Sequence, residues 1–218
     1  MCGRFALYSP YPKIAARLGL PVLEDQLEPR YNVPPGVWIS AARHPGGDEP
    51  LALDYVWWGY KPKWAGEKAP TPINASAEKV ATSGYYKQAF SRGRCLIPAN
   101  GWYEWDKSVK PRQPYFICRQ DRELLWMAAI WAERADGRPG CAIITEPSRG
   151  ATQAIHDRMP LLLDDASLEP WLDPDLTDRE TIRNVVRHID AELIEHWPVS
   201  RAVNTSSEDL GAELINPA

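Results

Sequence analysis

The sequence contains no run of about 18 apolar residues, which is the length that a membrane-spanning helix needs. Its first ten residues, MCGRFALYSP, also lack the basic and apolar regions of a secretory signal. From these two absences we predict a cytoplasmic protein that keeps its own start and has no membrane partner.

Cysteine and histidine are both scarce, with four residues of each type. The cysteines form no CxxC pair and the histidines do not cluster in the sequence, so a structural zinc site lacks its ligands. Cys95, Cys118 and Cys141 lie in apolar, strand-like runs and are predicted to be small buried residues. We expect neither a metal nor another cofactor.

Positive charge is not in excess, because the formal net charge is −4. This balance argues against a protein that coats nucleic acid indiscriminately, since such binding depends on neutralising phosphates. A local basic groove is still compatible with this net charge.

The ten Trp and 21 Pro residues are numerous for this length. Aromatic rings beside Arg or Lys are typical of surfaces that bind single strands, and packing in the core is the alternative for most of the Trp residues.

The length of 218 residues and the 44% hydrophobic content predict one domain over residues 1–218. Apolar periodicity predicts helices over 11–20, 77–92, 166–172 and 179–189. Strands are predicted over 51–60 and within RCLIPANGWYEW, QPYFICR, LLWMAAIWAE and GCAIITEP. The Pro-rich segments RYNVPPGVW and KPKWAGEKAPTP are predicted loops, and WPVSRAVN is predicted to be extended. The pattern indicates an α+β fold with a curved antiparallel, β-rich and barrel-like core.

Cys2 acquires new chemistry if Met1 is removed, and a small second residue favours that removal. The freed α-amine has a reference pKa of about 7.7–8.0, so part of it is nucleophilic near neutral pH. The amine can form a Schiff base with an aldehyde, and the thiol can then close a thiazolidine ring. The ring-opened sugar of an abasic site in DNA is such an aldehyde. The alternative is that Cys2 is only a small residue near the terminus.

Eight sequence blocks follow one another along the whole chain. They are MCGRF (1–5), RYNVPPG (30–36), WWGYKPKW (57–64), INASAE (73–78), RCLIPANGWYEW (94–105), MAAIW (127–131), IHDRMP (155–160) and PVSRAVN (198–204). With these blocks in this order, the chain resembles the SRAP family of SOS response-associated peptidases or abasic-site-processing proteins. The resemblance implies a β-rich barrel flanked by helices, with a positively charged cleft for single-stranded DNA. It also implies a thiazolidine crosslink between Cys2 and an abasic site that shields the lesion, with lyase and autoproteolytic activities beside it.

The resemblance carries four catalytic positions onto this sequence, namely Cys2, Asn74, Glu104 and His156. Alternation in a strand puts Glu104 on the same face as Trp102, where aromatic surroundings would raise its pKa and suit proton transfer with the Cys2 amine. A carboxylate in water on an edge strand is the alternative. His156 is predicted at a helix end that faces a cleft, where it would protonate the sugar ring oxygen; a structural histidine is the alternative.

Asn74 cannot exchange protons usefully, so it is predicted to position the Cys2 amine or a sugar hydroxyl through hydrogen bonds. An N-cap before the following helix is the alternative. Ser76 occupies the position at which the family usually has Arg, which puts a phosphate contact in doubt. Lys79 or Lys87 could compensate for it from the following helix.

Several cations and aromatic residues are predicted to contact DNA, each with an ordinary surface or core role as the alternative. They are Arg4, Trp57, Trp58, Lys61, Lys63, Trp64, Arg158 and Arg201. The expected partner is single-stranded DNA that contains abasic sites, bound by a monomer that joins the nucleoid on DNA.

Three other functions remain open at this stage. Glutamine amidotransferases of the N-terminal nucleophile type also begin Met-Cys-Gly, but they need an oxyanion hole and a clamp for the glutamine carboxylate, which we do not identify. A peptidase fits the family's historical label. A noncatalytic reader of single-stranded DNA would bind without Cys2.

Overall fold

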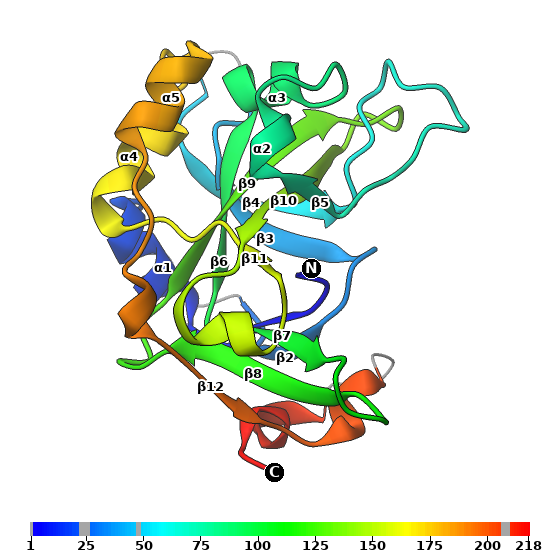
Figure 1. Cartoon of the computed structure of the whole chain (residues 1–218). Helices are drawn as coiled ribbons and strands as arrows, with labels where there is room; N and C mark the ends of the chain where they lie inside the picture. The colour runs from blue at the N-terminus through cyan, green and yellow to red at the C-terminus, as the bar shows by residue number, and fades with distance from the viewer. Residues whose placement is uncertain (1, 22–26, 47–48, 206–209) are drawn as a thin grey trace.

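The computed structural model describes residues 2–21, 27–46, 49–205 and 210–218. Five strands close into a barrel in the order β10-β4-β3-β6-β9, because β9 pairs with β10. They are β3 (Trp38–Arg43), β4 (Ala52–Trp58), β6 (Arg94–Ala99), β9 (Leu125–Glu133) and β10 (Pro139–Pro147). The predicted barrel-like core of an α+β fold is confirmed (Figure 1).

The pairing in the barrel is mixed, whereas we predicted an antiparallel sheet. β4 and β10 run parallel, with Gly140 opposite Trp57 and Cys141 opposite Trp58. A closed barrel with an odd number of strands cannot alternate direction all the way round, so at least one pair must be parallel. The last half of β10 leaves this pairing and binds β5 (Asn74–Ser76) and β11 (Arg158–Pro160) on its two edges.

A second, fully antiparallel sheet packs below the barrel in the orientation of Figure 1. Its order is β12-β8-β7-β1-β2. The strands are β1 (Phe5–Leu7), β2 (Arg30–Val33), β7 (Gly101–Asp106), β8 (Gln113–Arg119) and β12 (Ile194–Pro198). Alternation along β7 sends Trp102 into the barrel-side core and Tyr103 into a smaller cluster on the outer face. Both faces of β7 are therefore buried.

Asn100 and Gly101 divide the predicted strand RCLIPANGWYEW into β6 and β7, one in each sheet. The Asn100 Oδ1 accepts hydrogen bonds from the backbone N–H groups of Tyr8 and Ser9, at 2.8 and 2.9 Å. A Cβ atom on Gly101 would lie 2.4 Å from the ring of Phe116, so only glycine fits there. This break turns the chain out of the barrel and carries Glu104 into the second sheet.

The helices are short and cover the sides of the barrel. They are α1 (Tyr11–Leu18), α2 (Ala77–Val80), α3 (Lys87–Arg92), α4 (Leu168–Leu172) and α5 (Arg179–Val185). α1 buries Ile14 and Ala15 and ends at Gly19, whose φ of 65° suits a left-handed C-cap. None of the helices within the described residues is long and apolar enough to cross a membrane.

Four sequence predictions of local structure were wrong. The helix over 77–92 is two helices, because a turn at 81–86 holds Gly84 and turns Tyr85 and Tyr86 toward Tyr60. The helix over 179–189 ends at Val185. RYNVPPGVW is not all loop, because its first four residues form β2, which pairs with β1. WPVSRAVN is not fully extended, because Arg201–Asn204 form a 3₁₀ turn that the side chain of Ser200 caps.

Candidate active site

Glu104 lies in the middle of the second sheet, because β7 is flanked by β1 on one side and β8 on the other. Its side chain is only 4% exposed. The alternative of an edge-strand carboxylate in water is therefore wrong. Burial raises the pKa of Glu104 to about 7, so the group can both hold and release a proton near neutral pH.

Cys2 lies three residues ahead of the start of β1 and is fully buried. β1 runs antiparallel to β7, with Phe5 opposite Trp102 and the Arg4 carbonyl accepting the N–H of Tyr103 at 2.9 Å. Continued by three residues, this register brings Cys2 to the part of β7 that holds Glu104. Burial raises the pKa of the Cys2 thiol, and the nearby Glu104 carboxylate raises it further.

His156 follows a 3₁₀ helix (η1, Gly150–Ala154) and precedes β11, as the prediction of a helix end expected. Its Nε2 lies 3.9 Å from Oε2 of Glu104, and its side chain is 8% exposed. Its Nδ1 accepts the backbone N–H of Arg158 at 3.0 Å. Burial lowers the pKa of His156, and the positive charge of Lys107 lowers it further. The imidazole is thus driven toward its neutral form.

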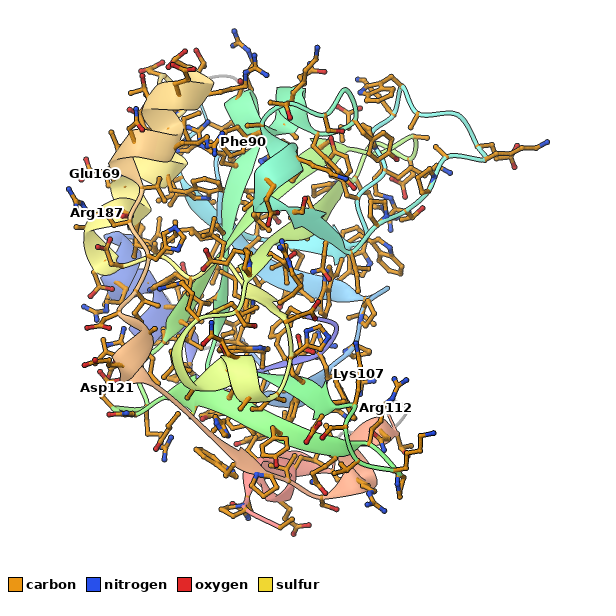
Figure 2. The ribbon with its side chains drawn as sticks, in the orientation of Figure 1. Phe90, Lys107, Arg112, Asp121, Glu169 and Arg187 are labelled. Carbon is orange, nitrogen blue, oxygen red and sulfur yellow. The ribbon has the colours of Figure 1, made fainter. Side chains whose placement is uncertain are left out.

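Lys107 belongs to this cluster but was not predicted. Its Nζ lies 3.0 Å from Nε2 of His156. It stands just after the end of β7, on the right-hand side of the molecule in Figure 2. Strand alternation cannot find it, because an odd spacing of three residues from Glu104 would place it on the opposite face. Only the turn after Asp106 brings the amine back toward the imidazole.

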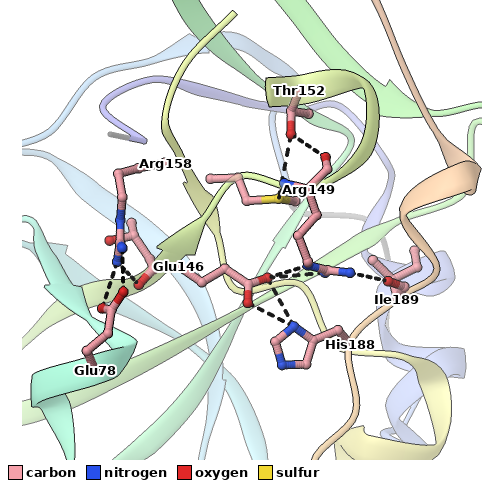
Figure 3. A network of polar contacts seen from close by, with 9 residues as sticks. Glu78, Glu146, Arg149, Thr152, Arg158, His188 and Ile189 are labelled. Carbon is pink, nitrogen blue, oxygen red and sulfur yellow. Dashed lines mark hydrogen bonds and ion pairs between the residues drawn. The ribbon is translucent and has the colours of Figure 1, made fainter. Parts of the chain in front are cut away.

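A polar network supports the segment 147–157 that carries His156 (Figure 3). The buried carboxylate of Glu146 accepts hydrogen bonds from Arg149 and pairs with Nδ1 of His188 at 2.9 Å. Arg158 binds both carboxylate oxygens of Glu78, at 2.6 and 3.0 Å. These contacts fix both ends of the segment to β10 and α2, so they hold His156 indirectly.

Asn74 lies in β5, opposite Ile143 of β10, and its Nδ2 is 3.5 Å from the Ile143 carbonyl oxygen. It is not the N-cap of α2, because Ser76 holds that position. Its Oδ1 is buried, with no hydrogen-bond partner among the residues that the structure describes. The positioning role of Asn74 toward Cys2 stays a prediction.

Three of the residues predicted to contact DNA are engaged inside the molecule. Trp58 is fully buried and donates from Nε1 to the Ile73 carbonyl at 3.0 Å, so its ring is a core residue and cannot stack on a base. Arg4 donates to Oδ1 of Asn32 at 2.6 Å, and burial lowers its pKa. Arg158 is held by Glu78, as described above.

The other predicted contacts lie nearer the surface. Lys61 and Lys63 lie on the segment between β4 and β5, where Lys63 is 63% exposed and pairs with Glu133. Trp64 on the same segment is 58% exposed. Trp57 is partly buried and Arg201 is exposed. Their contacts with DNA stay predictions. Within the described parts of the chain, no group of three or more His, Cys, Asp or Glu could hold a metal ion.

Comparison with known proteins decides the family. The model of the SOS response associated peptidase (SRAP) family matches residues 1–206. The chain belongs to this family. A relative named abasic site processing protein YedK, from Escherichia coli, is 37% identical over 226 residues and is covered completely, as is this chain. The abasic site processing protein YoqW of Bacillus subtilis is 31% identical, with 99% of each chain covered.

Similar proteins extend to vertebrates and to solved structures. The abasic site processing protein HMCES of Gallus gallus is 31% identical, over 88% of this SRAP chain and 67% of the relative. The crystal structure of a phage-related protein from Bordetella bronchiseptica matches with a TM-score of 0.76 and 30% identity, over 92% of this chain and 95% of that one. A structure from Bacteroides thetaiotaomicron shares the fold, with a TM-score of 0.82 at 21% identity and full coverage of both chains.

Proposed function

We propose that this SRAP protein processes abasic sites in single-stranded DNA by forming a covalent crosslink through Cys2. The observation that carries the proposal is the juxtaposition of three buried groups, in which Glu104 lies beside both Cys2 and His156. The relatives named for abasic site processing support it, because the most similar of those given above aligns over the complete chain. The reacting amine exists only after Met1 is removed, so the proposal includes that step.

The proposed reaction joins an aldehyde to the aminothiol of Cys2. The Cys2 amine adds to C1′ of the ring-opened sugar, and loss of one water molecule leaves an imine. The thiol then adds to the imine carbon and closes a thiazolidine ring, with its proton passing to the imine nitrogen. Water is the only leaving product. The ring shields the lesion because neither nucleophile departs easily, and the imine that precedes it is the stage at which strand cleavage by elimination could compete.

Glu104 has the proton affinity that these steps require. With a pKa of about 7, the carboxylate accepts a proton from the attacking amine and the carboxylic acid returns it to the departing hydroxyl. His156, on the other side of Glu104, is proposed to protonate the ring oxygen of the closed sugar and so expose the aldehyde. Asn74 is proposed to orient the amine or a sugar hydroxyl. We also propose that the protein acts as a monomer in the cytoplasm.

The test is incubation of Met1-processed protein with a single-stranded oligonucleotide that bears one abasic site, followed by a denaturing gel and the intact mass of the product. We expect a heat-resistant adduct with the wild-type protein and none with Cys2→Ala. Cys95→Ala is the matched control, because Cys95 is also a fully buried thiol. It should form the adduct as the wild type does.

The product mass separates the outcomes. A mass equal to protein plus DNA minus one water fits both the imine and the thiazolidine, and resistance of the adduct to heat supports the thiazolidine because an imine hydrolyses. Absence of an adduct from protein whose Met1 removal has been verified would refute the crosslink. Glutaminase activity that depends on Cys2 would instead favour the N-terminal nucleophile hydrolase. A noncatalytic reader would be favoured if the wild type formed no adduct and Cys2→Ala bound single-stranded DNA noncovalently as tightly as the wild type.

A further inference from the structure

Lys107 adds a positive charge to the cluster of Cys2, Glu104 and His156. Its side chain is exposed, yet its Nζ lies 3.0 Å from Nε2 of His156, whose own side chain is 8% exposed. Other lysines of the chain pair with carboxylates, as Lys63 does with Glu133 at 3.1 Å. Lys107 contacts a buried imidazole instead. It therefore lies on the solvent side of the pair formed by His156 and Glu104.

The backbone on both sides of Lys107 is held by a turn. Asp106, the last residue of β7, is opposite Gln113 of β8, and its Oδ1 accepts the N–H of Ser108 at 2.8 Å. Asp commonly stabilises turns through such a bond to the backbone two residues on. Figure 2 shows Lys107 and Arg112 on the hairpin between these two strands. Local contacts thus place the Lys107 amine next to the imidazole.

The amine of Lys107 and Nε2 of His156 are both suited to donate. Nδ1 of His156 accepts the Arg158 N–H at 3.0 Å, so the proton of the neutral imidazole is on Nε2. A protonated lysine amine has three N–H donors and no acceptor. Donors that are 3.0 Å apart converge on one small volume, and an oxygen atom that lies against both accepts from both. The two side chains therefore indicate a position for a substrate oxygen.

The charges around His156 support this assignment. Burial lowers the pKa of His156, and the positive charge of Lys107 lowers it further. The Asp157 carboxylate, whose Oδ1 is 2.9 Å from Nδ1, opposes this shift without reversing it. Burial raises the pKa of Glu104, and the Lys107 charge partly offsets that rise. Lys107 thus favours a neutral imidazole that can give a proton and an ionised carboxylate that can take one.

We propose that Lys107 and His156 together hold the ring oxygen O4′ of the closed abasic sugar, and that Lys107 is a further catalytic residue for the opening of the ring. The inference rests on the proposed function for the identity of the sugar. A cation beside O4′ stabilises the negative charge that develops there as the C1′–O4′ bond breaks. Lys107 acts on this oxygen, so it is not required once the aldehyde is exposed.

The ring-opening step is an isomerisation that needs no co-reactant. The Nε2 proton of His156 passes to O4′, which keeps the electron pair of the broken C1′–O4′ bond. The C1′ hydroxyl gives its proton to the Glu104 carboxylate, and the C1′=O double bond forms. Nε2 then holds a lone pair, and the Lys107 ammonium 3.0 Å away donates a hydrogen bond to it. The proton on Glu104 returns to Nε2, from which Oε2 is 3.9 Å away, so both groups are restored.

The test compares two aldehydes in single-turnover reactions of the Met1-processed protein. One is a single-stranded oligonucleotide with one abasic site, at a saturating concentration, and the other is acetaldehyde, which has no ring to open. Lys107→Gln should form the DNA adduct about 10²–10³-fold more slowly, the range for loss of one donor to a developing oxyanion. It should form the acetaldehyde adduct at the wild-type rate, with Cys2→Ala as the blank. Lys107→Arg keeps the charge and the N–H donors, so it should recover most of the DNA rate.

Lys110→Gln is the matched control, because Lys110 is exposed on the same hairpin and the substitution removes the same charge. It should keep the wild-type rate with both aldehydes. The contact between Lys107 and His156 has a second readout that needs no aldehyde. The pKa of His156, followed by NMR, should rise in Lys107→Gln because the lysine charge lowers it, and it should not move in Lys110→Gln.

Several results would overturn the role of Lys107 in ring opening. They are equal slowing of Lys107→Gln with both aldehydes, equal DNA rates of Lys107→Gln and Lys110→Gln, and slowing that higher DNA concentrations abolish, which marks a phosphate contact. An unchanged His156 pKa in Lys107→Gln would show that the two donors do not meet. If the wild type forms an adduct with neither aldehyde, the proposed function itself fails, whereas adducts formed equally fast by the wild type and Lys107→Gln refute the role of Lys107 alone.

Discussion

Nε2 of His156 lies 3.9 Å from Oε2 of Glu104, and both side chains are more than nine-tenths buried. Burial moves their pKa values in opposite directions, upward for the carboxyl group and downward for the imidazole. Each shift favours the uncharged form of its group near neutral pH. Because Nδ1 of His156 accepts the Arg158 N–H, the neutral imidazole carries its proton on Nε2, the nitrogen that faces Glu104, and this is the proton that the proposal gives to the sugar ring oxygen.

Glu104→Gln should stabilise the protein in a pH-dependent way. The pKa of Glu104 is about 7 in the folded chain, against an ordinary value of 4.5. Between these values the folded state binds the proton more tightly, so the wild-type free energy of unfolding falls as the pH rises. The advantage of Gln should be near zero at pH 4 and reach on the order of 3 kcal/mol at pH 8. Urea unfolding at both pH values measures it, and a difference independent of pH would contradict the assignment.

Glu104→Gln should also slow the formation of the adduct with an abasic site. We expect the single-turnover rate of adduct formation to fall by about 10²–10⁴-fold, which is the usual contribution of a general acid or base. A plot of the logarithm of the wild-type rate against pH should change slope near pH 7, and this inflection should be missing from Glu104→Gln. Glu169→Gln, at an exposed position in α4, is the control and should keep it. A wild-type inflection that survives in Glu104→Gln would assign it to another group.

Ser76→Arg should strengthen noncovalent binding to single-stranded DNA, because the family usually has Arg at this position. One additional phosphate contact should steepen the slope of log K against log salt by about 0.7. Titration at three salt concentrations measures this change. Thr82→Arg adds the same charge at an exposed position in the turn after α2, so it controls for the change in overall charge. Equal slopes for the two variants would place residue 76 away from the DNA.

Arg94→Met should destabilise the protein by about 3 kcal/mol or more, because it removes a buried charged donor from five carbonyl oxygens. The guanidinium donates to the carbonyls of Phe90, Ser91, Trp171, Asp173 and Leu176. It thereby joins the ends of two helices to the barrel. Thermal unfolding measures the loss. Arg92→Met, in the same segment but exposed, should cost less than about 1 kcal/mol.

Individual residues show where reasoning from the sequence was sufficient. Alternation in GWYEW correctly put Trp102 and Glu104 on one buried face, because side chains in a strand alternate whatever its neighbours are. Cys95, Cys118 and Cys141 are buried as their apolar runs predicted. Trp58 was wrongly predicted to contact DNA and is instead fully buried in the core. The motif contains two adjacent Trp residues, and the sequence does not reveal which of the two rings faces the core.

The order of its sequence blocks by itself determined the family of this protein, and local patterns determined its first helix and the strand segments that form β4 and β6 to β10. The tertiary structure alone decided that β9 pairs with β10 and closes the barrel, and that Lys107 and Glu78 act on the segment around His156. These contacts join residues that are 6 to 80 positions apart. Periodicity describes one element at a time, whereas such contacts depend on how turns and sheet closure bring separate elements together.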